Sequence, residues 1–353
     1  MNCLQLTRAF AGRLIRQVNT DTPCALPAPR RQVFVAGVVG RMGGKHQHSF
    51  IAGSILPLAL LALAGAHAQT APAITALPLP APVQTSAAPV LPLNPALPTV
   101  FVVGDSTASN QADLGWGDHL ARYFDTTRIN VANRAMAGRS SRSFIREGRW
   151  DNVLAEMKPG DYVLIQLGHN DGNALDGMKP RGTIKGLGEE TRYVTLLDGN
   201  FETVHTYGWY MRKYIADTRA RHATPILLTL TIRNVWTTGV DGKPHIERDM
   251  GYNDFIRQLA NDQKVLLVEM GNDEADHLEA LGPEKTALLF PKDHTHTSAM
   301  GAELNAQSVL RALSKTRSPL TACLAQGIEW PEIAPLALPL PPAVTKPADP
   351  AAK

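Results

Sequence analysis

Two short polar segments of the chain contain the residue types that hydrolyse esters in serine enzymes. The sequence GDS at residues 104–106 supplies a hydroxyl nucleophile, and the sequence DHTH at residues 293–296 supplies an imidazole three residues after a carboxylate. Catalysis by serine needs a base that accepts the hydroxyl proton and a carboxylate that orients this base. We therefore predict that Ser106 is the nucleophile, His296 the base and Asp293 the residue that orients the imidazole.

Two further polar segments contain hydrogen-bond donors for the anion that forms during ester hydrolysis. We predict that the backbone N–H groups of Ser106 and Gly138 and the side-chain amide of Asn170 form this oxyanion hole. Arg139 and His169 stand next to these donors in the sequence. Both are candidate substrate-binding residues.

Each of these features also has an ordinary structural explanation. Gly-Asp-Ser is a common turn sequence, Gly138 suits a left-handed backbone position, and Asn170 suits a turn. Ser298 is expected to cap the helix that follows it rather than to react. Catalysis is favoured because all four segments occur in one chain, each after a predicted strand or in a late loop.

A metal site is a second interpretation of the segment around His296. Asp293, His294 and His296 are adequate zinc ligands, since zinc binds imidazole and carboxylate groups. No partner cluster of ligands stands out elsewhere in the sequence. We therefore predict no metal and no other cofactor.

The elements that must position these residues alternate between strands and helices. Short apolar, β-branched runs predict buried strands at 99–104, 129–132, 162–167, 225–232 and 265–268. Helices are predicted at about 118–123, 143–157, 207–215, 252–261 and 298–313. This alternation indicates a three-layer α/β/α sandwich with a central parallel sheet, a flavodoxin-like α/β fold. Ligands bind at the carboxyl ends of such strands, where the polar segments cluster.

The chain divides into four predicted parts. Residues 1–68 are a leader and signal peptide, with a possible true start at Met42, and residues 69–98 form a Pro/Ala-rich linker. The esterase domain is predicted at 99–325, followed by a Pro-rich tail at 326–353. The apolar run that ends in Ala-His-Ala at 66–68 predicts cleavage after Ala68, and hence a secreted or periplasmic protein without a stable membrane span after processing.

The charge distribution argues against a nucleic-acid partner. The formal net charge is +3, but residues 1–68 hold seven of the 35 Lys and Arg and only one of the 32 Asp and Glu. The remainder therefore carries 28 basic and 31 acidic residues. No basic surface of the kind that binds nucleic acid is indicated.

Together these segments form a recognisable pattern. The chain resembles the SGNH (GDSL) hydrolases, whose four name letters correspond here to Ser106, Gly138, Asn170 and His296. Longer strings, GRS at 138–140, GHNDG at 168–172, TYGWY at 206–210 and DHTHTS at 293–298, resemble the rhamnogalacturonan acetylesterases. The resemblance covers about residues 98–315. It implies an esterase that removes acetyl groups from the rhamnogalacturonan backbone of pectin, an acetylated plant cell-wall polysaccharide.

The substrate stays open at this stage. An SGNH esterase acting on xylan, bacterial glycans or small aryl and lipid esters is an alternative, and a catalytically inactive polysaccharide-binding protein is another. Arg139 is a candidate ligand for a uronate carboxylate, or else packs locally. Arg142, Arg146 and Arg149 either share that role or lie on a solvated helix face.

Two further features bear on the substrate. Trp116 and Trp236 either stack on sugars or are buried. The segment 173–202, rich in glycine and charge, predicts a surface loop near the site that could alter the substrate.

Overall fold

The computed structural model describes residues 92–111 and 113–328. The predicted leader, the signal peptide, most of the linker and most of the tail lie outside these residues. Within the part of the chain that is described, no helix has the length and apolar character needed to span a membrane.

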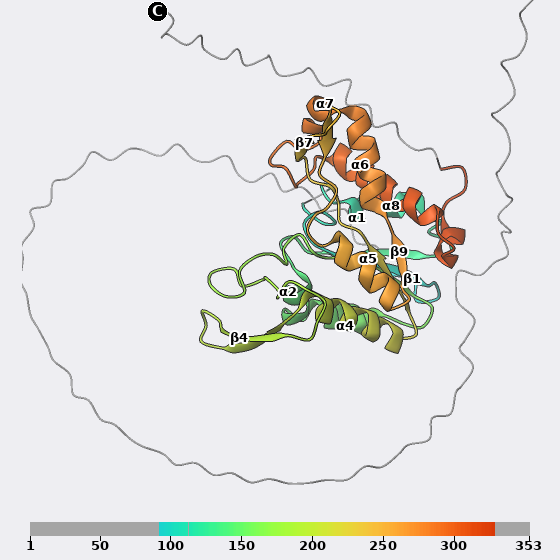
Figure 1. Ribbon diagram of the computed structural model, residues 1–353. Helices are drawn as coiled ribbons and strands as arrows, with labels where there is room; N and C mark the ends of the chain where they lie inside the picture. The colour runs from blue at the N-terminus through green and yellow to red at the C-terminus, as the bar shows by residue number, and fades with distance from the viewer. Residues whose placement is uncertain (1–91, 112, 329–353) are drawn as a thin grey trace, which may run out of the picture. The chain divides into compact units, whose positions relative to one another are not determined.

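A five-stranded parallel sheet forms the centre of the domain (Figure 1). Its strands lie in the order β2 (Asn130–Asn133), β1 (Thr99–Gly104), β3 (Tyr162–Gln166), β6 (Thr224–Leu228) and β9 (Leu266–Val268). Every neighbouring pair is parallel. This confirms the predicted sheet, and the order is the flavodoxin-like one. The chain leaves β1 in one direction to β2 and returns in the other to β3, so a crevice is expected at the carboxyl ends of β1 and β3.

Helices cover both faces of the sheet because alternate side chains of each strand point to opposite sides. In β1, Val100 and Val102 join one apolar cluster, whereas Phe101 and Val103 join the other. The first cluster is covered by α1 (Trp116–His119), the 3-10 helix η1 (Leu120–Tyr123) and α8 (Ala299–Ser314), with α6 (Met270–Leu281) packed along α8. The second is covered by α2 (Ser141–Arg146), α3 (Arg149–Glu156), α4 (Tyr207–Ala220) and α5 (Asn253–Asp262). The short α7 (Pro283–Ala287) and the 3-10 helix η2 (Pro319–Cys323) complete the helices of the described residues.

The predicted helix at 143–157 is wrong as a single element. It consists of α2 and α3, separated at Gly148, whose φ of +69° is left-handed. A residue in that conformation cannot continue an α-helix, and glycine adopts it without strain. The helices α6 and α7 were not predicted at all.

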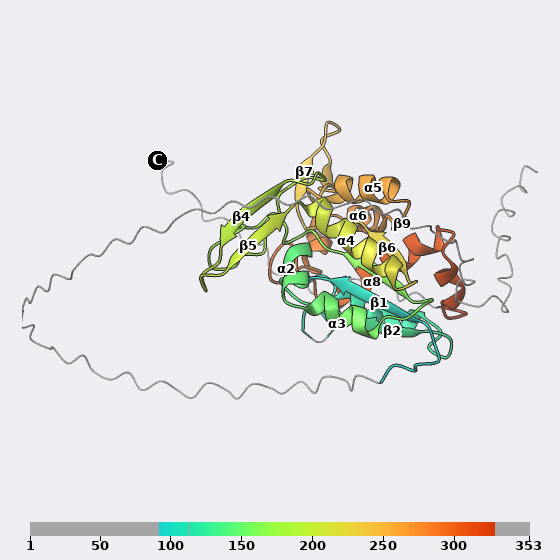
Figure 2. The same cartoon turned by 90° about the horizontal axis from the view of Figure 1, so that it is seen from below.

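The segment 173–202 is also not simply a loop. Residues Thr191–Thr195 (β4) and Phe201–His205 (β5) pair as an antiparallel hairpin, which projects beyond the neighbouring helices (Figure 2). Val194 and Val204 are buried on one face of it, while Tyr193 and Phe201 are exposed on the other. This alternation is a strand pattern that the glycine and charge content of the segment obscured. A second hairpin pairs β7 (Trp236–Thr238) with β8 (Pro244–Ile246).

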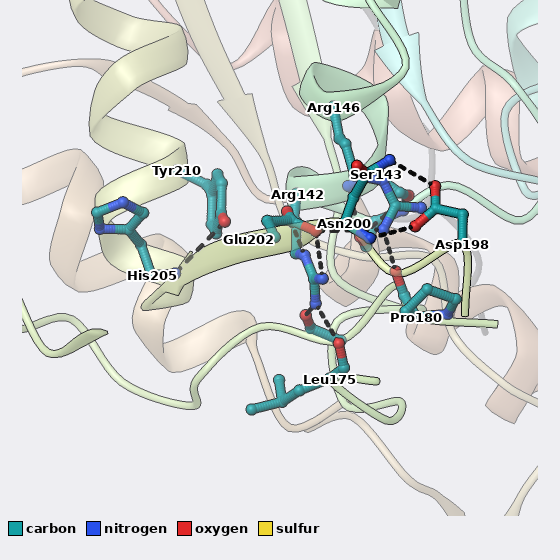
Figure 3. Close-up of polar contacts among 12 residues, drawn as sticks. Arg142, Ser143, Arg146, Leu175, Pro180, Asp198, Asn200, Glu202, His205 and Tyr210 are labelled. Carbon is teal, nitrogen blue, oxygen red and sulfur yellow. Dashed lines mark hydrogen bonds and ion pairs between the residues drawn. The ribbon is translucent and has the colours of Figure 1, made fainter. Parts of the chain in front are cut away.

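A buried arginine ties the first hairpin to α2 (Figure 3). The side chain of Arg142 is fully buried, and its Nε and Nη2 donate to the two carboxylate oxygens of Glu202 on β5 at 2.8 and 2.6 Å. Its Nη1 donates to the carbonyls of Leu175 and Gly182, both at 2.8 Å. The interpretation of Arg142 as part of a solvated helix face is therefore wrong. A buried guanidinium is tolerated here because a carboxylate and two carbonyls accept its hydrogen bonds.

Candidate active site

Ser106 lies in a tight turn directly after β1. The turn is shaped by Asp105, whose Oδ1 accepts hydrogen bonds from the backbone N–H and the hydroxyl of Thr107, both at 2.9 Å. The Asp105 carbonyl also accepts from the N–H of Ser109 at 3.0 Å. A buried strand and a carboxylate-closed turn thus fix the backbone that carries the Ser106 hydroxyl.

His296 lies beside Ser106, although 190 residues separate them in the sequence. The imidazole Nε2 is 2.9 Å from Ser106 Oγ, and Nδ1 is 2.7 Å from Asp293 Oδ2. The second oxygen of Asp293 accepts from the backbone N–H groups of Thr295 and His296 at 2.7 and 2.8 Å. One carboxylate therefore shapes the loop and also orients the ring within it.

Ser106 and His296 line a cavity of about 420 Å³ at the carboxyl ends of β1 and β3. The predicted oxyanion residues Gly138 and Asn170 line the same cavity. Among the described residues, the backbone N–H groups of Ser106 and Gly138 have no hydrogen-bond acceptor. The Asn170 amide donates to the Arg139 carbonyl at 3.0 Å. The complete lining is Ser106, Asn110, Ala137, Gly138, Asn170, Arg181, Lys292 and His296.

Two features of the backbone at Gly138 favour glycine. Its φ of +79° is left-handed, and a Cβ at this position would lie 3.2 Å from Arg181 Nη1. The next turn of the chain is fixed by Ser140, which caps α2 in a capping box with Ser143. The conformation at Gly138 and the cap at Ser140 thus both fix the loop that carries the Gly138 N–H.

Burial and hydrogen bonding shift the pKa values of several groups near the cavity. Burial opposes ionisation of Asp293, but hydrogen bonds from His296 and Thr295 outweigh it and lower the pKa of this carboxyl to about 2. Burial raises the pKa of Asp105 to about 6 and that of Asp171 to about 7. Asp293 is therefore an anion throughout the range in which an esterase works.

Neither predicted substrate-binding residue lines the cavity. The Nε of Arg139 donates to Glu147 at 2.8 Å and its Nη1 to the Ala137 carbonyl at 2.8 Å. These contacts favour the alternative in which Arg139 packs locally and orients its loop. His169 Nε2 lies 2.9 Å from Thr231 Oγ1, and burial lowers the pKa of this imidazole to about 3, so the ring is neutral. Direct contact of Arg139 or His169 with substrate stays a prediction.

The metal interpretation of the late loop is not supported by the geometry. Both ring nitrogens of His296 are engaged, one by Asp293 and one by Ser106. Within residues 92–111 and 113–328, no group of three or more His, Cys, Asp and Glu is arranged to hold a metal ion.

Ser298, Trp116 and Trp236 make contacts within the protein. Ser298 caps α8 by accepting from the Gly301 N–H, as predicted. Trp116 is fully buried, and its Nε1 donates to Gln166 at 2.7 Å, so it is not available to stack on a sugar. Trp236 is half-buried, and its Nε1 donates to Asn234 at 2.8 Å.

Four residues of the cavity wall were not predicted: Asn110, Ala137, Arg181 and Lys292. Lys292 directly precedes Asp293, so proximity in the sequence could have identified it. The segment 173–202 was predicted to lie near the site, but nothing in the sequence singles out Arg181 within it.

Comparison with known proteins identifies the family. The model of the GDSL-like lipase/acylhydrolase family matches residues 102–304. The chain belongs to this family. It is 34% identical over 215 residues to the rhamnogalacturonan acetylesterase of Emericella nidulans, covering 61% of this chain and 84% of that protein. It is 30% identical over 237 residues to the probable rhamnogalacturonan acetylesterase YesY of Bacillus subtilis, covering 63% and 95%.

A solved structure agrees with this assignment. The crystal structure of YxiM from Bacillus subtilis matches with a TM-score of 0.50 and 26% identity, covering 62% of this chain and 56% of that one. The chain thus spans about half the length of YxiM. The family consists of carboxylic ester hydrolases, so this chain is an esterase with the SGNH fold, as the sequence motifs predicted.

Proposed function

We propose that the chain is a serine carbohydrate esterase that hydrolyses acetyl esters on pectic rhamnogalacturonan. The observation that supports the mechanism most is the line of hydrogen bonds from Asp293 through His296 to Ser106, at 2.7 and 2.9 Å. A carboxylate, an imidazole and a hydroxyl in this order activate serine as a nucleophile in unrelated folds.

The reaction proceeds in two halves. Ser106 Oγ attacks the acetyl carbonyl carbon while His296 Nε2 accepts the hydroxyl proton, and a tetrahedral anion forms. When this anion collapses, the sugar oxygen leaves with the proton from His296 and the acetyl group stays on Ser106. A water molecule then attacks the carbonyl carbon of the acetyl-enzyme while His296 accepts its proton, and a second tetrahedral anion forms. When this anion collapses, the bond from the acetyl carbon to Ser106 Oγ breaks, Oγ takes the proton back from His296, and acetate is released. Asp293 remains ionised throughout and stabilises the imidazolium.

The oxyanion of each half is stabilised by two backbone N–H groups without another acceptor and by one N–H of the Asn170 amide. The backbone N–H groups of Ser106 and Gly138 are without acceptors in the described part of the chain, and both residues line the cavity. The Asn170 amide uses one N–H for the Arg139 carbonyl, and the second is left for the substrate. Removing one such donor typically slows an enzyme by about 10² to 10³.

The pectic substrate is supported by the two relatives at 34% and 30% identity, which are named rhamnogalacturonan acetylesterase and probable rhamnogalacturonan acetylesterase. The decisive experiment measures acetate release from acetylated rhamnogalacturonan and from acetylxylan, with p-nitrophenyl acetate as the neutral small ester. We expect the pectic polymer to be the better polysaccharide substrate. Faster release of acetate from acetylxylan than from acetylated rhamnogalacturonan would reject the pectic substrate, but not the esterase activity.

The role of Ser106 is tested separately. Ser106→Ala should abolish hydrolysis of all three substrates while the far-UV and near-UV circular dichroism spectra stay unchanged. A serine-directed phosphonate should label Ser106 in the wild type. A phosphonate adduct on another serine would show that the nucleophile has been misassigned.

We also propose that the protein is exported and cleaved after Ala68, on the basis of the apolar run that ends in Ala-His-Ala at 66–68. N-terminal sequencing of material from the native host should begin at Gln69. A cytoplasmic protein that begins at Met1 or Met42 would contradict this.

A further inference from the structure

Two cationic side chains line the cavity that contains Ser106 and His296. These are Arg181 and Lys292. Neither has a carboxylate within ion-pair distance in the part of the chain that the structure describes, whereas Arg139 is paired with Glu147. Asp293 follows Lys292 in the sequence, but its carboxylate contacts the ring of His296 instead. The cavity wall therefore carries two positive charges that the protein itself does not neutralise.

The guanidinium of Arg181 makes two hydrogen bonds to the described part of the protein, the longer of them from Nη2 to Asn173 Oδ1 at 3.4 Å. Its Nη1 donates to the Gly138 carbonyl at 3.0 Å, which fixes the guanidinium beside the predicted oxyanion loop. Its Nε is buried and has no hydrogen-bond partner among the described residues. A buried guanidinium N–H without an acceptor is costly unless a ligand or water accepts its hydrogen bond.

The backbone on each side of Arg181 is fixed as well, and Figure 3 shows Arg146 beside Pro180 on one of these sides. The Pro180 carbonyl accepts from Arg146 Nη1 and the Gly182 carbonyl accepts from Arg142 Nη1, both at 2.8 Å. The buried Arg142 is held in turn by Glu202. A side chain positioned by such a supporting shell loses little conformational entropy when it binds an anion.

Lys292 reaches the cavity from the loop that carries Asp293 and His296, whereas Arg181 reaches it from beside Gly138. A single exposed lysine contributes little, because water and salt screen its charge. Two cations on the wall of one cavity reinforce each other, since a cleft lined by one sign of charge concentrates the potential.

We propose that Arg181 and Lys292 form an anion-binding subsite that takes the carboxylate of a uronate unit adjacent to the acetylated sugar. This inference rests on the proposed function and names the feature of the glycan that the site selects. Arg181 supplies directed N–H donors for the carboxylate, and Lys292 supplies a second positive charge at the opposite loop. Acetylated glycans that carry carboxylates are therefore preferred to neutral acetylated glycans.

The test is a binding measurement that does not depend on catalysis. Isothermal titration calorimetry of the full chain with oligogalacturonate is compared with the same oligomer after methyl esterification of its carboxyl groups. We expect the charged oligomer to bind at least about five-fold more tightly at low ionic strength, and this preference to shrink in 0.5 M NaCl. Lys292→Gln should reduce the preference about three-fold or more, and Arg181→Gln at least as much.

Lys179→Gln is the matched control, because Lys179 is an exposed lysine of the segment that carries Arg181 and does not line the cavity. Lys179→Gln removes one positive charge, as Lys292→Gln does, and should leave the preference for the charged oligomer unchanged. Equal affinity for the two oligomers, or equal effects of Lys292→Gln and Lys179→Gln, would overturn the subsite. Acetate release is measured in parallel, so failure of the esterase proposal is recognised independently of oligomer binding.

Discussion

Asp293 contacts His296 twice, with a different oxygen each time. Oδ1 accepts the backbone N–H of His296 at 2.8 Å, and Oδ2 lies 2.7 Å from its ring Nδ1. The spacing of three residues is what permits both contacts, since one short loop closes around one carboxylate. The same side chain therefore folds the loop and sets the orientation of the ring.

Asp293→Asn separates these two roles. The asparagine oxygen can still accept the loop N–H groups, but its NH₂ faces ring Nδ1 and no longer accepts a proton from it. The imidazole then takes the wrong tautomer, and we expect kcat on p-nitrophenyl acetate to fall by about 10³ to 10⁴ with little change in stability. His294→Ala is the control and should retain activity. A loss of less than ten-fold in Asp293→Asn would remove Asp293 from the mechanism.

Gly138→Ala should impair both folding and catalysis. A side chain is strained at the left-handed φ of +79°, and the added Cβ at 3.2 Å from Arg181 Nη1 requires that guanidinium to move by a few tenths of an ångström. Gly148→Ala is the control, because its φ is +69° but no atom lies within 4 Å of the added Cβ. Both variants should lose about 1 to 2 kcal/mol of unfolding free energy. Only Gly138→Ala should also lose about 100-fold in kcat, and comparable activity in the two would argue against an oxyanion role for Gly138.

The ion pair between Arg142 and Glu202 should matter far more than surface pairs. Arg142→Gln leaves the largely buried Glu202 carboxylate without its main partner, so we expect a loss of about 3 to 5 kcal/mol in urea unfolding. Arg134→Gln, which breaks a more exposed pair with Glu156, should cost less than about 1 kcal/mol. Similar small losses in both would mean that the hairpin is not anchored by Arg142.

Asp171 should make stability depend on pH in the direction opposite to that of a salt-bridged aspartate. Burial raises the pKa of its carboxyl in the folded state to about 7, above the unfolded value of about 3.9. Between these values the folded state binds the proton more strongly, so wild-type stability falls as pH rises from about 4 to 7, by at most about 1.4 kcal/mol per pH unit.

Asp171→Asn removes this titration and isolates its effect. The stability of the wild type relative to the variant should decrease between pH 4.5 and 7 and stay level above pH 8, as measured by urea unfolding at each pH. Asp105, whose pKa burial raises to about 6, is present in both proteins, so the effect of its own burial cancels from the difference; its repulsion of the Asp171 carboxylate does not cancel and adds to the decrease. A difference that is constant with pH, or that increases with pH, would contradict the raised pKa.

The sequence alone determined the central sheet and the positions of the reactive groups along the chain. Buried parallel strands are short and almost entirely apolar, so β1 and β3 were evident from their residues, and polar residues directly after them pointed to the carboxyl edge. The contact between Asp293 and His296 could be expected from the sequence because it is local: three residues and one loop contain it.

Only the tertiary structure decided which charged residues face the cavity. Arg139, next to Gly138 in the sequence, is paired with Glu147, whereas Arg181, 43 residues from Gly138, donates to its carbonyl. Arg142 is buried because the hairpin of β4 and β5 returns over α2 and brings Glu202 to it. Such contacts depend on how distant segments pack, and neither periodicity nor spacing along the chain contains that information. The strands of the sheet follow from local apolar patterns, but the charge at the cavity follows from the fold.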